Sequence, residues 1–400
     1  MMSKFNVYIN IVMAYGLLIA LFFSLSTLSN TIPQSSIYDN AKESKEYFSQ
    51  HDTYPEVLNV SYFTLDYFTD ALMINIASTG DDEPILDTTL LNPYHSQSKG
   101  ISEGLNTQNS SDIEHYSRYW HGYLLVLKPL LIFYSYNQIR IINAIFLLLV
   151  TCYCFYLIYI KVGKRIAVSF IISLLLIAFP IVPLTFQFST CFYIAFIATI
   201  ILLKFPQLTN TRDGSIIFFF IVGGATSYFD FLTTPQITLG FPLVAYLIKE
   251  NRFNKVKELL VLGCIWALGY ASIWVSKWLI AYILTGENVI MAAVEQAEYR
   301  TAGEYNTQCL NTPIKILSYI IPFITLFLLF IYKKYTIGKK AVKDNLYLLL
   351  LALFVPAWYL LLRNHSVVHY WFTWRAIVLT IFCILCFMSK TLNFNNHEQS

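Results

Sequence analysis

Two carboxylates, Asp66 and Asp70, lie four residues apart in the segment SYFTLDYFTDALMINIA, residues 61–77. The apolar positions of this segment follow helical spacing, and Thr64 or Asp66 is in place for an N-cap. The two carboxylates therefore share one face near the positive end of a short helix. A carboxylate pair at a membrane surface suits general acid–base catalysis. The same spacing is also typical of ordinary acids at the start of a solvated helix.

A second group of candidate residues is cationic and lies in residues 117–149. His121 stands in an aromatic cluster, Lys128 precedes a proline within an apolar stretch, and Arg140 opens the next apolar run. A cation at this depth usually has a partner, and a lipid phosphate is one that fits. The alternative interpretation is an interfacial aromatic belt with a snorkelling arginine.

Two further charged positions stand at the ends of apolar runs or between them. Asp230 lies within an aromatic run, where an unpaired charge is costly. We expect it either to contact a polar substrate or to pair with Arg140 or Lys277. Arg300 lies in a polar segment, residues 285–312, which suits a loop that covers a site.

The segment RNHSVVHYWFTWR, residues 363–375, interleaves cations with aromatic residues. Such a pattern suits a phosphate held by His365, His369 or Arg375 beside a sugar that stacks on the rings. An aromatic belt at the membrane interface is the alternative. His365 and His369 have the i, i+4 spacing of some zinc ligands, but no third ligand is near in sequence. We therefore expect no metal ligation by these histidines, and a divalent cation as cofactor is the alternative.

These ionisable residues are scarce in a very apolar chain. Of 400 residues, 56% are hydrophobic and 13% are charged, and the mean hydropathy is +0.54. Soluble domains carry about 25% charged residues. The composition therefore excludes a soluble enzyme, a disordered scaffold and a protein whose partner is a nucleic acid. It predicts an all-α polytopic membrane protein.

Ten apolar runs approach the length of about 20 residues that a membrane helix needs. They are residues 5–28, 138–160, 166–183, 187–204, 214–232, 236–249, 257–284, 313–332, 345–363 and 374–389. We divide the chain into a first transmembrane helix (1–28), an extracytoplasmic loop with juxtamembrane helices (29–137), and a transmembrane domain of about nine helices (138–400).

Residues 119–135 are apolar but carry a Lys-Pro pair near the middle, and the positive-inside rule decides their place. If they do not cross the membrane, 16 of the 27 basic residues but only five of the 24 acidic ones lie inside, all in short segments. If they cross, 15 of those 16 basic residues move outside. We therefore expect this segment to lie at the outer interface, with both termini in the cytoplasm.

The seven cysteines do not form a disulfide framework, because six of them fall in apolar segments. We expect small, buried side chains. Cys383 and Cys386 form a C-x-x-C in the middle of an apolar run, with no second pair to complete a metal site.

This arrangement resembles the GT-C superfamily of membrane glycosyltransferases. TLDYFTDALMINIA, residues 64–77, occupies the place of the superfamily's acidic motif and the helix after it. WHGYLLVLKPLLIFYSYNQIRIIN, residues 120–143, is similar to its apolar stretch and next helix start, with His121 and Arg140 in comparable positions. The resemblance covers roughly residues 1–205. The acidic pair is usually adjacent, whereas here it is separated, so the identity of the base stays open.

The resemblance implies an inverting glycosyl transfer from a polyprenyl-phosphate-linked sugar to a glycan or lipid-linked acceptor. The enzyme would lie in the bacterial cytoplasmic membrane, face outward and use no cofactor. Asp70, slightly preferred, or Asp66 would deprotonate the acceptor hydroxyl. Cations would hold the donor phosphate, and the candidates are Lys128, Arg140, His369 and Arg375. The alternatives are a polysaccharide polymerase or ligase, or a transporter (flippase) of lipid-linked glycans.

Overall fold

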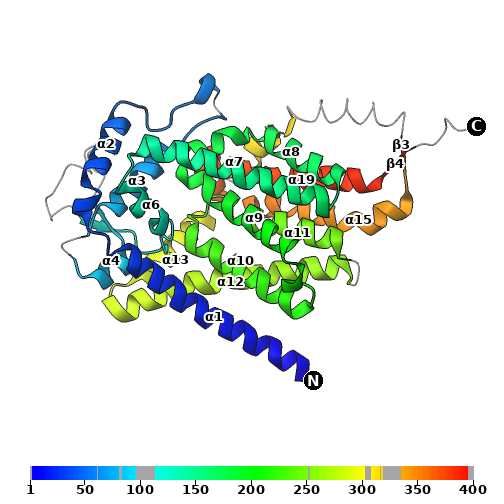
Figure 1. The fold of residues 1–400 in the computed structure, drawn as a ribbon, viewed down its shortest axis with the longest axis horizontal. Helices are drawn as coiled ribbons and strands as arrows, with labels where there is room; N and C mark the ends of the chain where they lie inside the picture. The colour runs from blue at the N-terminus through cyan, green and yellow to red at the C-terminus, as the bar shows by residue number, and fades with distance from the viewer. Residues whose placement is uncertain are drawn as a thin grey trace, which may run out of the picture.

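The computed structural model describes residues 2–60, 62–80, 83–95, 113–250, 253–301, 308–315, 317–318 and 335–394. Figure 1 shows a bundle of long helices with a cap of short helices at one end. The N-terminal end of α1 and the C-terminal end of α19 both lie away from this cap, which holds α2, α3 and α4 (Figure 1). The short helices thus form one end of the molecule.

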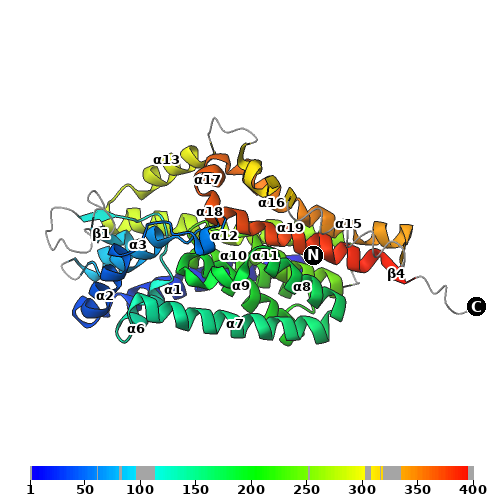
Figure 2. The same ribbon diagram turned by 90° about the horizontal axis from the view of Figure 1, so that it is seen from above.

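The helices of the bundle are α1 (Met2–Ser29), α7 (Tyr136–Lys161), α8 (Lys164–Leu176), α9 (Phe186–Lys204), α10 (Arg212–Phe229), α11 (Gln236–Lys249), α12 (Lys255–Thr285), α15 (Lys339–Ala352) and α19 (Ile377–Thr391). The helix α13 (Val289–Thr301) and the short helices α16 (Phe354–Leu361), α17 (Arg363–Val368) and α18 (Tyr370–Thr373) accompany them. Buried side chains from α7 to α12 and from α15 to α19 form one large apolar core. Figure 2 shows α13 beside α17, and the two helices are in contact.

The cap lies between α1 and α7 in the sequence and has its own apolar core. Its helices are α2 (Tyr38–Ser49), α3 (Tyr67–Ala77), α4 (Ile85–Leu91) and α6 (Leu124–Leu131). Two antiparallel strand pairs complete the described elements: β1 (Pro93–His95) with β2 (Ile113–His115) in the cap, and β3 (Tyr335–Ile337) with β4 (Leu392–Phe394) at the far end.

Within the described residues, six helical segments are long and apolar enough to cross a membrane. They are Val7–Ser29, Tyr136–Lys161, Phe186–Lys204, Lys255–Thr285, Lys339–Leu361 and Tyr370–Thr391. Large apolar side chains are exposed along them, including Leu17 at 67% and Leu148 at 60%. Exposed apolar surface on this scale marks contact with a membrane. The described structure is consistent with the predicted all-α membrane protein, apart from the two short strand pairs.

Several predicted spans have other bounds in the structure. The span predicted at 166–183 is helical only to Leu176, because Pro180 and Pro183 turn the chain into a 3₁₀ segment, Phe179–Leu184. The span predicted at 236–249 matches α11, whose 14 residues are about 21 Å long and short of the hydrocarbon thickness. Most of the span predicted at 313–332 lies outside the described residues.

The segment at 119–135 contains only the eight-residue helix α6. Such a helix is about 12 Å long and cannot cross a bilayer. The prediction that this segment does not span the membrane agrees with the structure.

Two glycines set the close crossing of α10 and α12. A Cβ on Gly223 would lie 2.1 Å from the carbonyl oxygen of Trp266, and one on Gly269 would lie 2.2 Å from that of Phe220. Small residues allow helix backbones in membranes to approach in this way. The pair therefore anchors the part of the bundle that supports α13.

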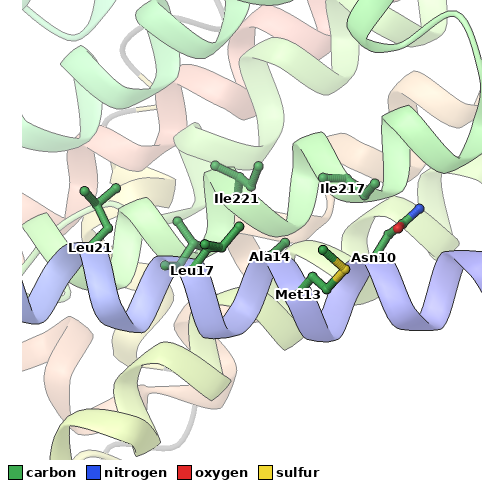
Figure 3. A pocket seen from close by; sticks show the side chains of 8 residues that line it. Asn10, Met13, Ala14, Leu17, Leu21, Ile217 and Ile221 are labelled. Carbon is green, nitrogen blue, oxygen red and sulfur yellow. The ribbon is translucent and has the colours of Figure 1, made fainter.

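An apolar groove of about 370 Å³ runs between α1 and α10 (Figure 3). Its lining is formed by Asn10, Met13, Ala14, Leu17, Leu18, Leu21, Ile217 and Ile221. Asn10 is the one polar side chain in this lining, so the groove offers a surface for lipid chains and little chemistry.

Candidate functional site

Asp66 begins helix α3 and is almost completely buried, with 1% of its surface exposed. Its Oδ1 accepts a hydrogen bond from the backbone N–H of Thr69 at 2.9 Å, and its Oδ2 accepts one from the Thr69 hydroxyl at 2.9 Å. The N-cap predicted at Thr64 or Asp66 is therefore Asp66. Because both Asp66 and Asp70 are buried, the interpretation of acids on a solvated helix is wrong.

The other face of the Asp66 carboxylate meets the segment before α19. The indole N–H of Trp371 donates to Asp66 Oδ2 at 3.2 Å, across 305 positions of sequence. Arg375, which is 1% exposed, donates to the carbonyl oxygens of Trp371 and Thr64. Burial raises the pKa of Asp66 above its ordinary value, while the bonds from Thr69 and Trp371 and the charge of Arg375 oppose the rise. The structure thus brings a carboxylate and a buried guanidinium together.

Asp70 has a different environment, at the N-terminus of α9. The Tyr136 hydroxyl donates to its Oδ2 at 2.7 Å, and the backbone N–H groups of Phe186 and Gln187 donate to its Oδ1 at 3.0 and 3.3 Å. Burial raises the pKa of Asp70 to about 8, the Tyr136 bond opposes the rise, and the charge of Asp66 adds to it. A carboxylate in this place satisfies free N–H groups of α9 and ties the cap to the bundle.

Arg140, on the first turns of α7, lies in a cage of tyrosines. Its guanidinium donates to the hydroxyls of Tyr47 and Tyr67 at 2.9 and 2.7 Å and lies 5.5 Å from the ring centroid of Tyr136. Tyr136 in turn bonds to Asp70. Arg140, the tyrosines and Asp70 therefore form one network, rather than the direct pair of Arg140 with Asp230 considered from the sequence.

Lys128 and His121 are buried and make hydrogen bonds that stabilise the cap. Lys128 is buried on α6 and donates to the side-chain oxygen of Asn30, at the end of α1, at 2.7 Å. The His121 ring bonds to the carbonyl of Tyr116 at 2.7 Å and to the hydroxyl of Tyr123 at 3.2 Å. Burial lowers the pKa of His121 to about 3, so its imidazole is neutral at pH 7. Their role as phosphate ligands stays a prediction.

A second cluster joins the Asp230 loop to α13 and α17. The His365 ring bonds to the carbonyl of Leu232 at 2.9 Å, and its centroid lies 4.8 Å from that of His369. Arg300 donates to the Tyr119 hydroxyl at 2.6 Å. Burial lowers the pKa of both histidines, to about 4 for His369, and the nearby charge of Arg300 contributes. The Nδ1 atoms of both rings are buried without a hydrogen-bond partner in the described structure.

Asp230 itself turns the chain between α10 and α11. Its carboxylate accepts hydrogen bonds from the backbone N–H and the hydroxyl of Thr233. The Cys191 thiol lies 3.4 Å from the same hydroxyl. Lys277, the other predicted partner, instead donates to backbone carbonyl groups in the cap, including that of Thr89. The Asp230 carboxylate can be buried because the N–H and the hydroxyl of Thr233 donate to it.

Sequence reasoning missed the roles of Trp371, Tyr136 and Tyr54. Trp371 is one of the aromatic residues of 363–375, for which the sequence predicts stacking or an interfacial belt, yet its indole N–H donates to Asp66. The ring of Tyr54 lies 4.8 Å from that of Trp371, and Tyr54 is 39% exposed. A single tyrosine in a polar loop carries no periodic signal, so Tyr54 could not be found from the sequence.

The predicted residues thus fall into separate groups. Asp66 bonds to Trp371 and lies near the charge of Arg375, both in residues 363–375. His365, His369 and Arg300 form a neighbouring cluster through the same segment. Asp70 and Arg140 share the tyrosine network. Among the described residues, no three His, Cys, Asp or Glu side chains gather as metal ligands would.

Compared with known proteins, the chain matches no family model, no curated protein sequence and no solved structure.

Proposed function

We propose that the chain is an integral membrane glycosyltransferase of the bacterial cytoplasmic membrane. It transfers a sugar from a polyprenyl-phosphate donor to a glycan or lipid-linked acceptor on the extracytoplasmic side. In this proposal the ten predicted segments make up the membrane domain, both termini are cytoplasmic, and the cap faces outward. The position of the N-terminal end of α1 and the C-terminal end of α19 on the side away from the cap supports this topology (Figure 1).

One observation supports the chemistry most strongly. Asp66 from the first outer segment meets Trp371 and Arg375 from the last, at the junction of cap and bundle. A lipid-linked donor requires such a place, because its reacting phosphate lies at the membrane interface while its lipid stays in the bilayer. Burial also raises the pKa of the Asp66 carboxyl, and a stronger base accepts a proton more readily from a hydroxyl.

In the proposed reaction the acceptor hydroxyl gives its proton to Asp66, and its oxygen forms a bond to the anomeric carbon of the donor. The bond from that carbon to the phosphate oxygen breaks, and the lipid phosphate leaves with the electron pair. Arg375 faces the charge that develops, which such preorganised cations stabilise by several kcal/mol. The Nε–H of Arg375 is buried without a hydrogen-bond partner among the described residues, so one donor is free for this role.

We place the base at Asp66 rather than Asp70 because of where their partners lie. The donors to Asp70 are Tyr136 of α7 and the backbone of α9. Asp66 instead bonds to Trp371, whose ring contacts the half-exposed Tyr54. Arg300, His365 and His369 remain the candidates for the donor side. Their cluster is continuous with the Asp66 site, since the ring of His369 lies 5.3 Å from that of Trp371.

The test is reconstitution of the purified protein into liposomes with a polyprenyl phosphate that carries a labelled hexose. Transfer releases polyprenyl phosphate and moves the label to an added acceptor, and Asp66→Asn stops both. A transporter would move the label across the bilayer without cleaving it, and that result would reject the proposed reaction. A polymerase would instead extend a pyrophosphate-linked oligosaccharide.

A further inference from the structure

Three aromatic side chains lie together, and one of them, Trp371, bonds to Asp66. The ring centroid of Tyr54 lies 4.8 Å from that of Trp371 and 6.4 Å from that of Phe68, to which it is nearly parallel. Trp371 and Phe68 are half-buried, whereas Tyr54 is 39% exposed. We name these three residues the aromatic wall. It begins in solvent at Tyr54 and ends at a carboxylate.

The polar atom of the Trp371 indole is already used, because its N–H donates to Asp66. The rest of this half-buried side chain is apolar ring. Trp371 also joins Tyr54 to Asp66, because its ring contacts that of Tyr54. Burial, and then the charge of Asp66, raises the pKa of Tyr54 to about 12. A flat apolar surface beside a hydrogen-bond acceptor is a combination that a simple interfacial belt does not require.

A pyranose ring complements both parts of this surface. Its face with several axial C–H groups stacks on an aromatic ring, while its equatorial hydroxyls lie at the edge of the ring. We propose that the aromatic wall is a carbohydrate-binding site that takes the face of a pyranose ring beside Asp66. The identification of this sugar as the acceptor rests on the proposed function, whereas the binding does not.

The experiment measures saturation-transfer NMR of methyl β-D-glucopyranoside with the full-length protein in detergent micelles. D-Glucitol serves as the open-chain probe, because it has similar hydroxyls but no ring face. We expect Tyr54→Ala and Tyr54→Leu to weaken glucoside binding about 2- to 10-fold, the loss of one aromatic stacking contact, and Tyr54→Phe to retain it. Tyr38, which is 53% exposed on α2, provides the matched control: Tyr38→Ala should bind like the wild type.

Folding of each variant is checked by its thermal unfolding, and Tyr54→Leu keeps apolar volume where Tyr54→Ala removes it. Equal binding of glucoside and glucitol overturns the proposal, as does unchanged glucoside binding in both Tyr54→Ala and Tyr54→Leu. The latter result would show that these three side chains are only part of an interfacial aromatic belt.

Failure of this inference is distinct from failure of the proposed function. Glucoside binding that depends on Tyr54 in a protein without transferase activity keeps the aromatic wall and rejects the reaction. Transfer that Asp66→Asn abolishes, but that neither Tyr54→Ala nor Tyr54→Leu affects, keeps the reaction and rejects the wall.

Discussion

Replacement of Asp66 by Asn separates the chemistry of this residue from its structural role. Asn is as good an N-cap as Asp, so its amide oxygen keeps the bond from the Thr69 N–H and the start of α3 is preserved. The amide N–H₂ of Asn then takes the place of Oδ2, whose partners are the Thr69 hydroxyl and the Trp371 indole. The Thr69 hydroxyl can rotate and accept, but the Trp371 indole cannot, and this one charged hydrogen bond is lost. Its loss costs about 1.5–3 kcal/mol of stability.

Trp371→Phe removes the same hydrogen bond from the other side and keeps both the ring and the carboxylate. The two variants should therefore lower the midpoint of thermal unfolding by similar amounts. Their activities should differ, because only Asp66→Asn removes a proton acceptor, and general base catalysis contributes about 100- to 10,000-fold. We expect Trp371→Phe to stay within about tenfold of the wild type, the activity cost of roughly 1.4 kcal/mol.

The assay is release of polyprenyl phosphate in liposomes, with unfolding followed on the same preparations. Asp39→Asn, on the exposed first turn of α2, controls for loss of one negative charge in the cap. It should leave both the release of polyprenyl phosphate and the midpoint of unfolding unchanged. The double variant should match Asp66→Asn in both measurements, since each change removes the same bond. If Trp371→Phe is as inactive as Asp66→Asn at equal stability, Asp66 acts only by holding the last segment, and the general-base assignment is refuted.

Three other substitutions test the framework. Tyr136→Phe removes a hydroxyl donor to Asp70, and we expect the unfolding free energy to fall by about 1.5–3 kcal/mol; unchanged unfolding would argue against the network. Gly223→Ala places a Cβ against a backbone carbonyl and should cost about 1–3 kcal/mol or more, whereas Gly16→Ala enters open space and should be neutral in the same unfolding assay. Burial lowers the pKa of His369 to about 4, so the unfolded chain binds more protons than the folded one between about pH 4 and 6.5. The unfolding free energy therefore falls as the pH drops through that window. His369→Gln should make the unfolding free energy depend less on pH there, and an unaltered slope would contradict the shift.

Local features of the fold could be predicted from the sequence because their causes are local. The N-cap at Asp66 follows from a short acceptor before a helical apolar pattern. The overlong span at 166–183 was also avoidable, since Pro180 and Pro183 both interrupt helical hydrogen bonding. Hydropathy averaged over a window does not register that interruption.

Contacts between distant segments could not be predicted. Nothing in the sequence indicates that Trp371 bonds to Asp66 rather than to a lipid headgroup, or that Tyr47 and Tyr67 enclose Arg140. Such partners are set by how the cap docks on the bundle, and that docking is the sum of many apolar contacts with no periodic signature. A single sequence therefore supplied the candidate residues but not their partners.

The helical spacing of Asp66 and Asp70 suggested one site with two interchangeable carboxylates, and the contacts assign them different tasks. Asp70 lies one turn deeper in α3 and bonds to the first N–H groups of α9, so its removal would leave buried donors of the bundle unsatisfied. Asp66 stands at the open end of the helix, where its partners come from the last segment and from a wall that reaches solvent. The proposed reaction therefore uses Asp66, whose partner Trp371 contacts the half-exposed Tyr54. Asp70 instead fixes the cap to the membrane helices.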